Sequence, residues 1–202
     1  MSSRREQNPD AEIDAILAEV REALTISHDT GEINELIALQ KLLELTKELH
    51  KIHNVRELIT KVLDSSLAFV MGERAFLLLF NSDGELTFKM GRDAEGNYLP
   101  REDFSPSTTA IAKTLEQRKT LIIPDAQTSE LLSKRDSVVR QSLREIVCSP
   151  MTLKKEIIGL IYIDNRIHAL PGYNRSHINV LASLSDQAAV AIRNAQKFET
   201  QT

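Results

Sequence analysis

The sequence is poor in the residues that build disulfides, metal sites and phosphate-binding loops. It has one cysteine, Cys148, no tryptophan and seven glycines in 202 residues. A single cysteine excludes an intramolecular disulfide and any multi-cysteine metal site, which is typical of a reducing compartment. No glycines stand in the spacing of a P-loop or a dinucleotide-binding turn, and no nucleophile elbow or pair of catalytic carboxylates appears. We therefore expect a cytoplasmic protein that is not an enzyme.

The sequence also lacks long apolar runs and an excess of charge of one sign. Nowhere do about 18 apolar residues follow one another, and residues 1–10 contain no apolar stretch, so we expect neither a standard secretion signal nor a membrane span. The 25 basic residues are balanced by 29 acidic ones, for a net charge of −4. This balance leaves no positive field to hold a phosphate backbone, and direct binding of nucleic acid is not expected.

Helical periodicity dominates both ends of the chain. Apolar residues three or four positions apart predict a helix over 11–24, with Asp10 as a candidate N-cap and a break at 27–31. A second helix carries a coiled-coil seam, and a final helix over 174–198 repeats the same strict spacing. We divide the chain into an N-terminal helical extension, 1–35, and one domain, 36–200. The seam residues chosen as a dimer contact are Leu42, Leu45, Leu49, Leu181, Leu184, Ala188, Ala191 and Ala195.

Between these helices the pattern changes to short apolar runs separated by turns. Asn54 and Glu57 have capping-box spacing and predict a helix over 55–70, whose broad apolar face should lie on a sheet. A central strand over 74–80 and a hairpin partner over 86–90 follow, then a loop over 97–105 and a helix capped by Ser105 or Ser107. Strands are expected over 121–123, 144–153 and 157–164, with short helices or a crossover over 128–141.

Four segments carry a resemblance to a known family. They are GERAFLLL at 72–79, LIIPDA at 121–126, REIVCSPM at 144–151 with IGLIYID at 158–164, and LASLSDQAAVAIRNA at 181–195. In this order they resemble a GAF domain, over residues 39–198, of the kind that precedes output modules in bacterial enhancer-binding transcription activators, cyclases and sensor kinases. The resemblance implies an α+β fold: an antiparallel five- or six-stranded sheet flanked by helices (GAF/PAS-like), with long amphipathic helices at both ends.

The resemblance also places a pocket between the sheet and its covering loops. The residues it would use are Phe88, Phe104, Ser105, Thr108, Asp125, Ser137, Arg144, Tyr162 and Asp164. Pockets of this family accept cyclic nucleotides, tetrapyrroles, metabolites or nothing. Free amides at a helix start and the Arg144 guanidinium would suit an anionic or nucleotide-like ligand. The alternative is that these residues only cap a helix and order a loop, with Tyr162 in the core and Asp164 ending a strand.

Two other candidate sites have plainer interpretations. Cys148 lies in a β run, where a buried thiol behaves as a small hydrophobe. Bilin-binding relatives use a differently placed cysteine, and relatives that reduce free methionine sulfoxide need more than one. His50 and His53 are three residues apart, but a metal would need further ligands, so a solvated helix face is the preferred interpretation.

Three functions compete on this basis. The first is a regulatory domain of a signalling or transcription-regulatory protein, which binds a small molecule and relays its state through dimeric helices. The second is a ligand-free module for dimerisation and relay, and the third, with least support, is an enzyme. The dimer hypothesis assumes that the terminal helical stripes find no apolar partner within their own chain. No cofactor is assigned.

Overall fold

The computed structural model describes residues 9–30, 35–123, 145–165 and 175–201. The predicted segment 128–141 and the candidate residues Asp125, Ser137 and Arg144 lie outside these ranges. The helices are α1 (Pro9–Thr30), α2 (Glu35–Leu49), α3 (Val55–Val70), the short 3-10 helix η1 (Arg101–Asp103), α4 (Thr108–Gln117) and α6 (Arg175–Gln201). The strands are β1 (Arg74–Phe80), β2 (Leu86–Asp93), β3 (Tyr98–Leu99), β4 (Leu121–Ile123), β5 (Glu145–Leu153) and β6 (Glu156–Asn165).

The strands form one six-stranded sheet in the order β3-β2-β1-β6-β5-β4. Every neighbouring pair is antiparallel, and β1 is central, as its continuous apolar run predicted. The expected antiparallel sheet flanked by helices is therefore confirmed. None of the helices in the described ranges is both long and apolar enough to span a bilayer.

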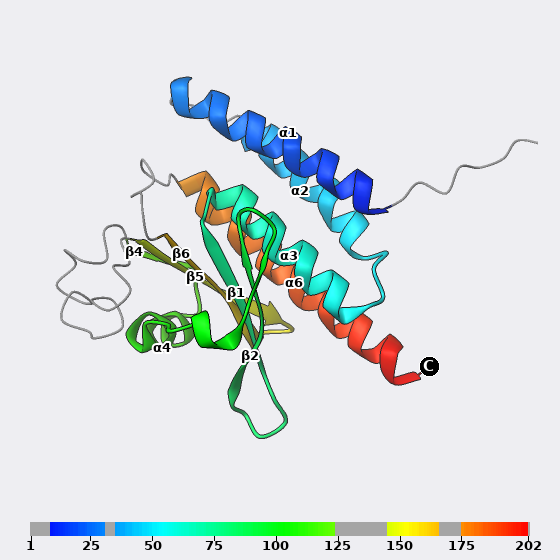
Figure 1. The fold of residues 1–202 in the computed structure, drawn as a ribbon, viewed down its shortest axis with the longest axis vertical. Helices are drawn as coiled ribbons and strands as arrows, with labels where there is room; N and C mark the ends of the chain where they lie inside the picture. Colours follow the sequence, from blue (N-terminus) through cyan, green and yellow to red (C-terminus); the bar gives the residue numbers. More distant parts are fainter. Residues whose placement is uncertain (1–8, 31–34, 124–144, 166–174, 202) are drawn as a thin grey trace, which may run out of the picture.

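Helices cover the two faces of the sheet unequally. On one face α3 and α6 lie side by side, and α1 and α2 pack on them from the side away from the sheet (Figure 1). The other face carries α4, which contacts β5 and β4. Alternation along each strand gives two cores. The larger lies between the sheet and α3 and α6, and the smaller lies between the sheet and α4.

Local signals explain where the inner helices begin. Asn54 caps α3, because its side chain accepts a hydrogen bond from the Glu57 amide at 2.9 Å. The first amide of α3, that of Val55, is satisfied from a distant element, since it donates to the Glu199 carboxylate of α6 at 2.8 Å. Of the two serines proposed to cap α4, Ser107 is the cap, and its hydroxyl accepts from the Ala110 amide at 3.2 Å.

The structure departs from the sequence prediction at two places outside the sheet centre. Helix α1 begins at Pro9, which suits a first helical position, and runs to Thr30, so residues 27–30 of the predicted break are helical. Asp10 therefore lies in the first turn rather than at the N-cap, and it pairs with Lys61 of α3 at 3.1 Å. The predicted loop 97–105 contains the edge strand β3, which pairs with Gly91 and Arg92.

The assumption behind the dimer contact is wrong, because the chain covers its own helical stripes. All eight seam residues are at most 7% exposed in the single chain. Leu42, Leu45 and Leu49 belong to the large core, since α2 packs against α1, α3 and α6. The α6 stripe lies in the same core, where α6 packs against β5 and α3. Apolar residues three and four positions apart indicate a buried helix face. Here that face is covered by other elements of the same chain.

Candidate functional site on the α4 face of the sheet

A β-bulge shapes the sheet surface beneath η1 and α4. Leu77 pairs with Met90 and Leu78 with Phe88, so Lys89 is an extra residue in β2. Without it, strict alternation would point Phe88 and Gly91 to opposite faces. With it, both lie opposite the α4-side residues of β1. A side chain at 91 would clash, because a Cβ there would stand 2.7 Å from the Phe76 ring.

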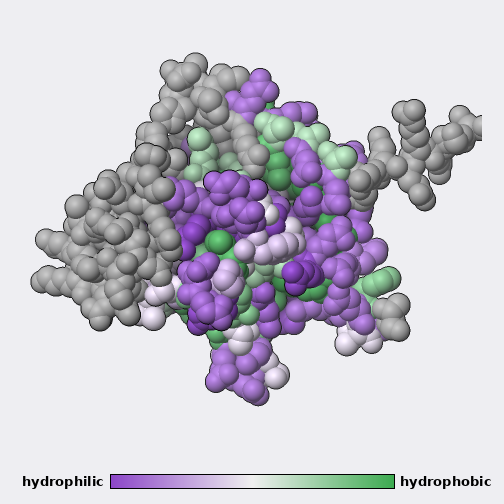
Figure 2. Space-filling view, in the orientation of Figure 1, coloured by the Kyte–Doolittle hydropathy of each residue, from purple (hydrophilic) through white to green (hydrophobic). Residues whose placement is uncertain are grey.

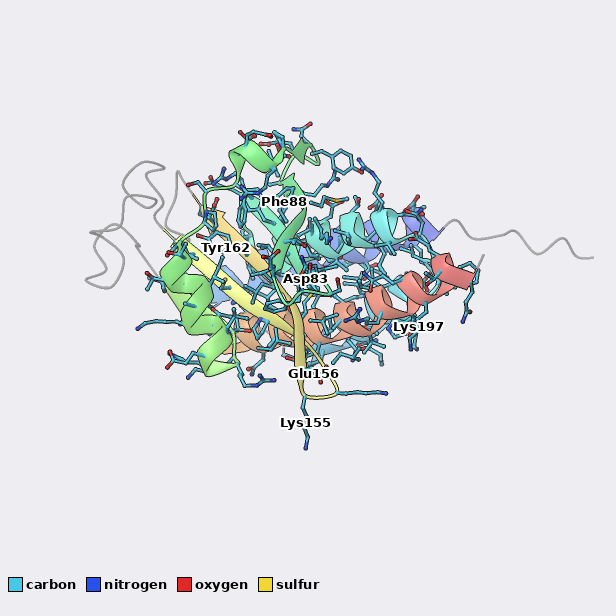
Figure 3. All side chains as sticks on the ribbon, turned by 90° about the horizontal axis from the view of Figure 1, so that it is seen from below. Asp83, Phe88, Lys155, Glu156, Tyr162 and Lys197 are labelled. Atoms are coloured by element: carbon cyan, nitrogen blue, oxygen red, sulfur yellow. The ribbon has the colours of Figure 1, made fainter. Side chains whose placement is uncertain are left out.

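Four aromatic rings meet on this surface, and we call them the aromatic cluster: Phe76, Phe88, Phe104 and Tyr162. Phe104, which follows η1, packs on all three others, with ring centroids 4.6 Å from Phe76, 5.8 Å from Phe88 and 5.6 Å from Tyr162. Phe88 is half-buried, whereas Phe76 and Tyr162 are fully buried. Figure 3 shows Phe88 and Tyr162 on their separate strands. The structure thus brings together three of the predicted residues, Phe88, Phe104 and Tyr162.

Tyr162 joins the sheet to the start of α4. Its hydroxyl oxygen accepts a hydrogen bond from the Ser107 amide at 3.0 Å, so the residue that caps α4 is itself tied to β6. Burial, and to a smaller degree the nearby Asp164 carboxylate, raises the pKa of Tyr162 well above its ordinary value. The phenol therefore stays neutral and acts as a structural anchor for α4.

Asp164 shares the face of Tyr162, as strand alternation predicted, but it is held by a partner that the sequence analysis missed. The Arg74 side chain donates two hydrogen bonds to the Asp164 carboxylate, at 2.7 and 2.6 Å. The two residues lie directly opposite each other on β1 and β6 and are 8% and 2% exposed. Arg74 also donates to the Asp103 carbonyl of η1 at 3.3 Å, next to Phe104. The signal in the sequence was an arginine as the first residue of an otherwise apolar strand.

A second arginine lies at the exposed rim of the aromatic cluster. The Arg101 guanidinium lies 5.9 Å from the Phe88 ring centre and 5.6 Å from that of Phe104. It also donates to the Phe104 carbonyl at 2.9 Å, which fixes it over the rings. Arg101 was not predicted, because its partners follow from the fold rather than from a motif. The site combines aromatic walls with a cation, which suits a planar or anionic molecule.

The remaining predicted residues contribute less. Ser105 is half-buried, and Thr108, the first residue of α4, is exposed at the helix surface. Asp125, Ser137 and Arg144 lie outside the described residues. Asp164, occupied by Arg74, serves to hold β1 to β6.

The two other candidate sites are Cys148 and the histidine pair His50 and His53. Cys148 is fully buried in the smaller core, and burial raises the pKa of its thiol to about 12, outweighing the opposite effect of the Thr114 hydroxyl. The helix face expected for His50 and His53 is wrong, because α2 ends at Leu49 and both exposed histidines lie between α2 and α3. His53 stacks on Phe198 with ring centroids 4.5 Å apart. Within the described ranges no three His, Cys, Asp or Glu side chains gather as metal ligands.

Comparison with known proteins supports the architecture. A family model described as a GAF domain matches residues 52–193. A GAF domain of a phosphoenolpyruvate-protein phosphotransferase from Coxiella burnetii is similar, with a TM-score of 0.61, 14% identity, and coverage of 83% of this chain and 99% of that one. A photoproduct-state GAF domain from Synechocystis sp. has a TM-score of 0.59 and 18% identity, over 74% of this chain and 99% of that one.

A segment of a methyl-accepting chemotaxis protein gives a TM-score of 0.54 with 20% identity, over 75% of this chain and 96% of that one. No curated protein matches the chain. At these identities the solved structures establish a shared fold, while the family model covers most of the described core, from the start of α3 to the middle of α6. The chain belongs to the GAF domain family.

Proposed function

We propose that this chain is a non-enzymatic, cytoplasmic sensory domain that binds a small planar anion on the α4 face and regulates a signalling or transcription-regulatory partner. The observation that carries the proposal is the Arg101 guanidinium fixed over two phenyl rings at the rim of the aromatic cluster. Stacking and charge together favour a flat, negatively charged ligand such as a cyclic nucleotide or a metabolite of that kind. Similar domains in a chemotaxis protein and a phosphotransferase are consistent with a regulatory role.

The sheet offers a physical route from this site to the helices. Tyr162 faces the site from β6, while its strand neighbours Ile161 and Ile163 face the large core on the other side. On β5, Ser149 accepts a hydrogen bond from Ser185 of α6 at 2.9 Å. A ligand that displaces η1 or α4 would alter strands that α6 contacts directly. The ligand can shift the equilibrium between two arrangements of the helices by no more than the difference between its binding free energies for them.

A ligand-free relay is the second candidate, and one observation favours it. Phe104 is 4% exposed and packs on three rings, so the centre of the aromatic cluster is filled by the protein's own side chain. In that case α4 and the sheet would form a fixed core. The two candidates differ in whether a small molecule changes the stability of the chain.

Pairing with a second copy remains part of the proposal, on a surface other than the buried stripes. The first half of α2 exposes large apolar side chains: Ile37 is 40%, Leu39 46% and Leu43 58% exposed. Leu39 and Leu43 are four residues apart and lie on one helix face. Figure 2 shows apolar residues gathered over α1 and α2 on an otherwise largely hydrophilic view.

Thermal unfolding with a panel of planar anions, beginning with cyclic AMP and cyclic GMP, tests the ligand proposal. A ligand at a hundred times its Kd should stabilise the chain by about 2.7 kcal/mol, or roughly 5 to 10 °C in Tm. Arg101→Ala should weaken binding by roughly two- to thirtyfold, the range expected for a cation–π contact.

Arg56→Ala is the matched control, because Arg56 lies 5.1 Å over the Tyr98 ring and belongs to the α3 side of the molecule. It should leave binding unchanged. Identical Tm values across the panel for the parent chain would favour the ligand-free relay.

A further inference from the structure

Four exposed cations gather where α4 ends beside the β5–β6 hairpin, and we call them the basic corner: Arg118, Lys119, Lys154 and Lys155. The two elements meet because the Arg118 guanidinium donates a hydrogen bond to the Lys155 carbonyl. Lys155 points away from the body of the molecule at the hairpin tip (Figure 3). Since Lys119 directly follows Arg118, one helix end and one turn present all four charges.

Three residues of the basic corner hold a backbone conformation that suits glycine or asparagine. The φ angle is 53° at Arg118, 49° at Lys154 and 70° at Lys155, and the other non-glycine residue with a positive φ in the described ranges is Met71. Glycine is common after a helix end, and asparagine followed by glycine in a two-residue hairpin turn, because a Cβ is strained in this left-handed region. The sequence has basic side chains at all three positions instead, at a cost in stability. Backbone strain of this kind gathers at functional sites.

The positive charges of the basic corner are not neutralised by the rest of the described chain. Among the residues that the structure describes, no carboxylate forms an ion pair with any of the four cations, whereas Lys41 and Lys61 are both paired. The acidic residues adjoining the corner in the sequence are Glu116 and Glu156, so four positive charges stand against two negative ones. The basic corner is therefore a positive surface on a chain whose net charge is −4.

The chemistry of the basic corner favours the carboxylates of a protein segment over nucleic acid or a lipid surface. The two segments that form it, 111–123 and 149–161, contain no aromatic residue on which a base could stack. Of the large apolar side chains exposed in the described ranges, none lies in these segments to anchor the corner in a bilayer. Three flexible ammonium groups and one guanidinium suit carboxylates spaced along an extended chain.

From these observations we infer that the basic corner binds an acidic segment of the partner that this domain regulates. The inference rests on the regulatory partner in the proposed function and is independent of its ligand part.

Helix α4 connects the basic corner to the aromatic cluster. Its N-cap, Ser107, is tied to Tyr162, and its C-cap, Arg118, is tied to the Lys155 carbonyl. The 10 residues between these caps span about 15 Å. A ligand that displaces α4 would therefore move Arg118 relative to the hairpin and alter the binding of an acidic segment.

Fluorescence anisotropy of a labelled oligoglutamate peptide tests this surface in the full-length chain. A glycine-serine peptide of equal length is the control. The glutamate peptide should bind and the control peptide should not. Raising the salt concentration from about 50 to about 200 mM should weaken binding several-fold, because exposed charges are screened.

Replacing the turn by Lys154→Asn with Lys155→Gly separates binding from folding, because it removes two charges while relieving the left-handed strain. This variant should weaken peptide binding roughly three- to thirtyfold, as expected for two exposed ion pairs. It should also raise the urea midpoint, so the loss of binding would not arise from misfolding. Lys154→Arg with Lys155→Arg keeps both charges and should bind like the parent.

The matched control is Lys47→Gln with Lys197→Gln, which removes two exposed lysines from α2 and α6. It should leave peptide binding unchanged. No binding of the glutamate peptide at low salt would overturn the inference, and so would equal binding by the parent and the Asn-Gly variant.

Phosphatidylserine vesicles and single-stranded oligothymidylate are compared in the same way. Tighter binding of either one, weakened in the Asn-Gly variant, would identify a membrane or nucleic acid as the partner and overturn the acidic segment. Any of these failures would leave the ligand proposal standing, because the Tm shift with planar anions and its reduction in Arg101→Ala do not involve the basic corner.

Discussion

Replacing Arg74 with methionine should destabilise the chain more than almost any other change of one charged side chain. The substitution keeps much of the side-chain volume but removes both hydrogen bonds to Asp164, at 2.7 and 2.6 Å. Asp164 is 2% exposed, so its carboxylate would lose both hydrogen bonds from Arg74 without regaining water in their place. Breaking a buried pair in this way costs about 3–5 kcal/mol, a large share of the 5–15 kcal/mol that holds a typical domain folded.

Urea unfolding followed by circular dichroism measures this cost. The double variant Arg74→Met/Asp164→Leu should recover most of the loss, because it removes the buried carboxylate together with the arginine that pairs with it. Arg101→Met is the matched control: Arg101 is exposed, and its loss should cost less than about 1 kcal/mol. An Arg74→Met chain within about 1 kcal/mol of the parent, or a double variant no better than the single one, would refute the argument.

Three further predictions concern the core, the hairpin tip and the thiol. Leu184→Asp should lower the free energy of unfolding by several kcal/mol rather than merely split a dimer, because Leu184 is fully buried in its own chain; circular dichroism melts should show this, and the exposed Asn194→Asp should melt like the parent. Lys154→Asn with Lys155→Gly should raise the free energy of unfolding by about 1–2 kcal/mol, because both lysines hold a positive φ, 49° and 70°, in a two-residue hairpin turn; an unchanged or lower urea midpoint would contradict this. Cys148 should resist a thiol reagent at pH 8 in the folded chain and react at once in urea, since its pKa of about 12 leaves almost no thiolate; rapid labelling of folded protein would show that the thiol is accessible.

Local signals predicted the elements of the fold well. Asn54 and Ser107 cap the helices that their sequence contexts indicated, because a capping side chain bonds to amides only three residues away. The apolar run of β1 and the hairpin of β5 and β6 were likewise visible, since strand burial and turn residues are local properties.

The parts that sequence reasoning missed depend on contacts between distant residues. The bulge at Lys89, which turns Phe88 toward the site, depends on pairing with β1 rather than on any turn residue. The partner of Asp164 is 90 residues away in the sequence. The seam residues of α2 and α6 were predicted to lie at a dimer contact, whereas the single chain buries them, because a stripe pattern does not distinguish a partner in the same chain from one in another.

Native mass spectrometry of the intact protein, purified from its own cells under gentle conditions, tests the proposed sensory role most directly. The account predicts a peak at the chain mass plus one small anionic molecule, with the bound fraction reduced in Arg101→Ala and unchanged in Arg56→Ala. Peaks at the bare chain mass alone, in the parent as in Arg101→Ala and with cyclic nucleotides added in excess, would contradict it.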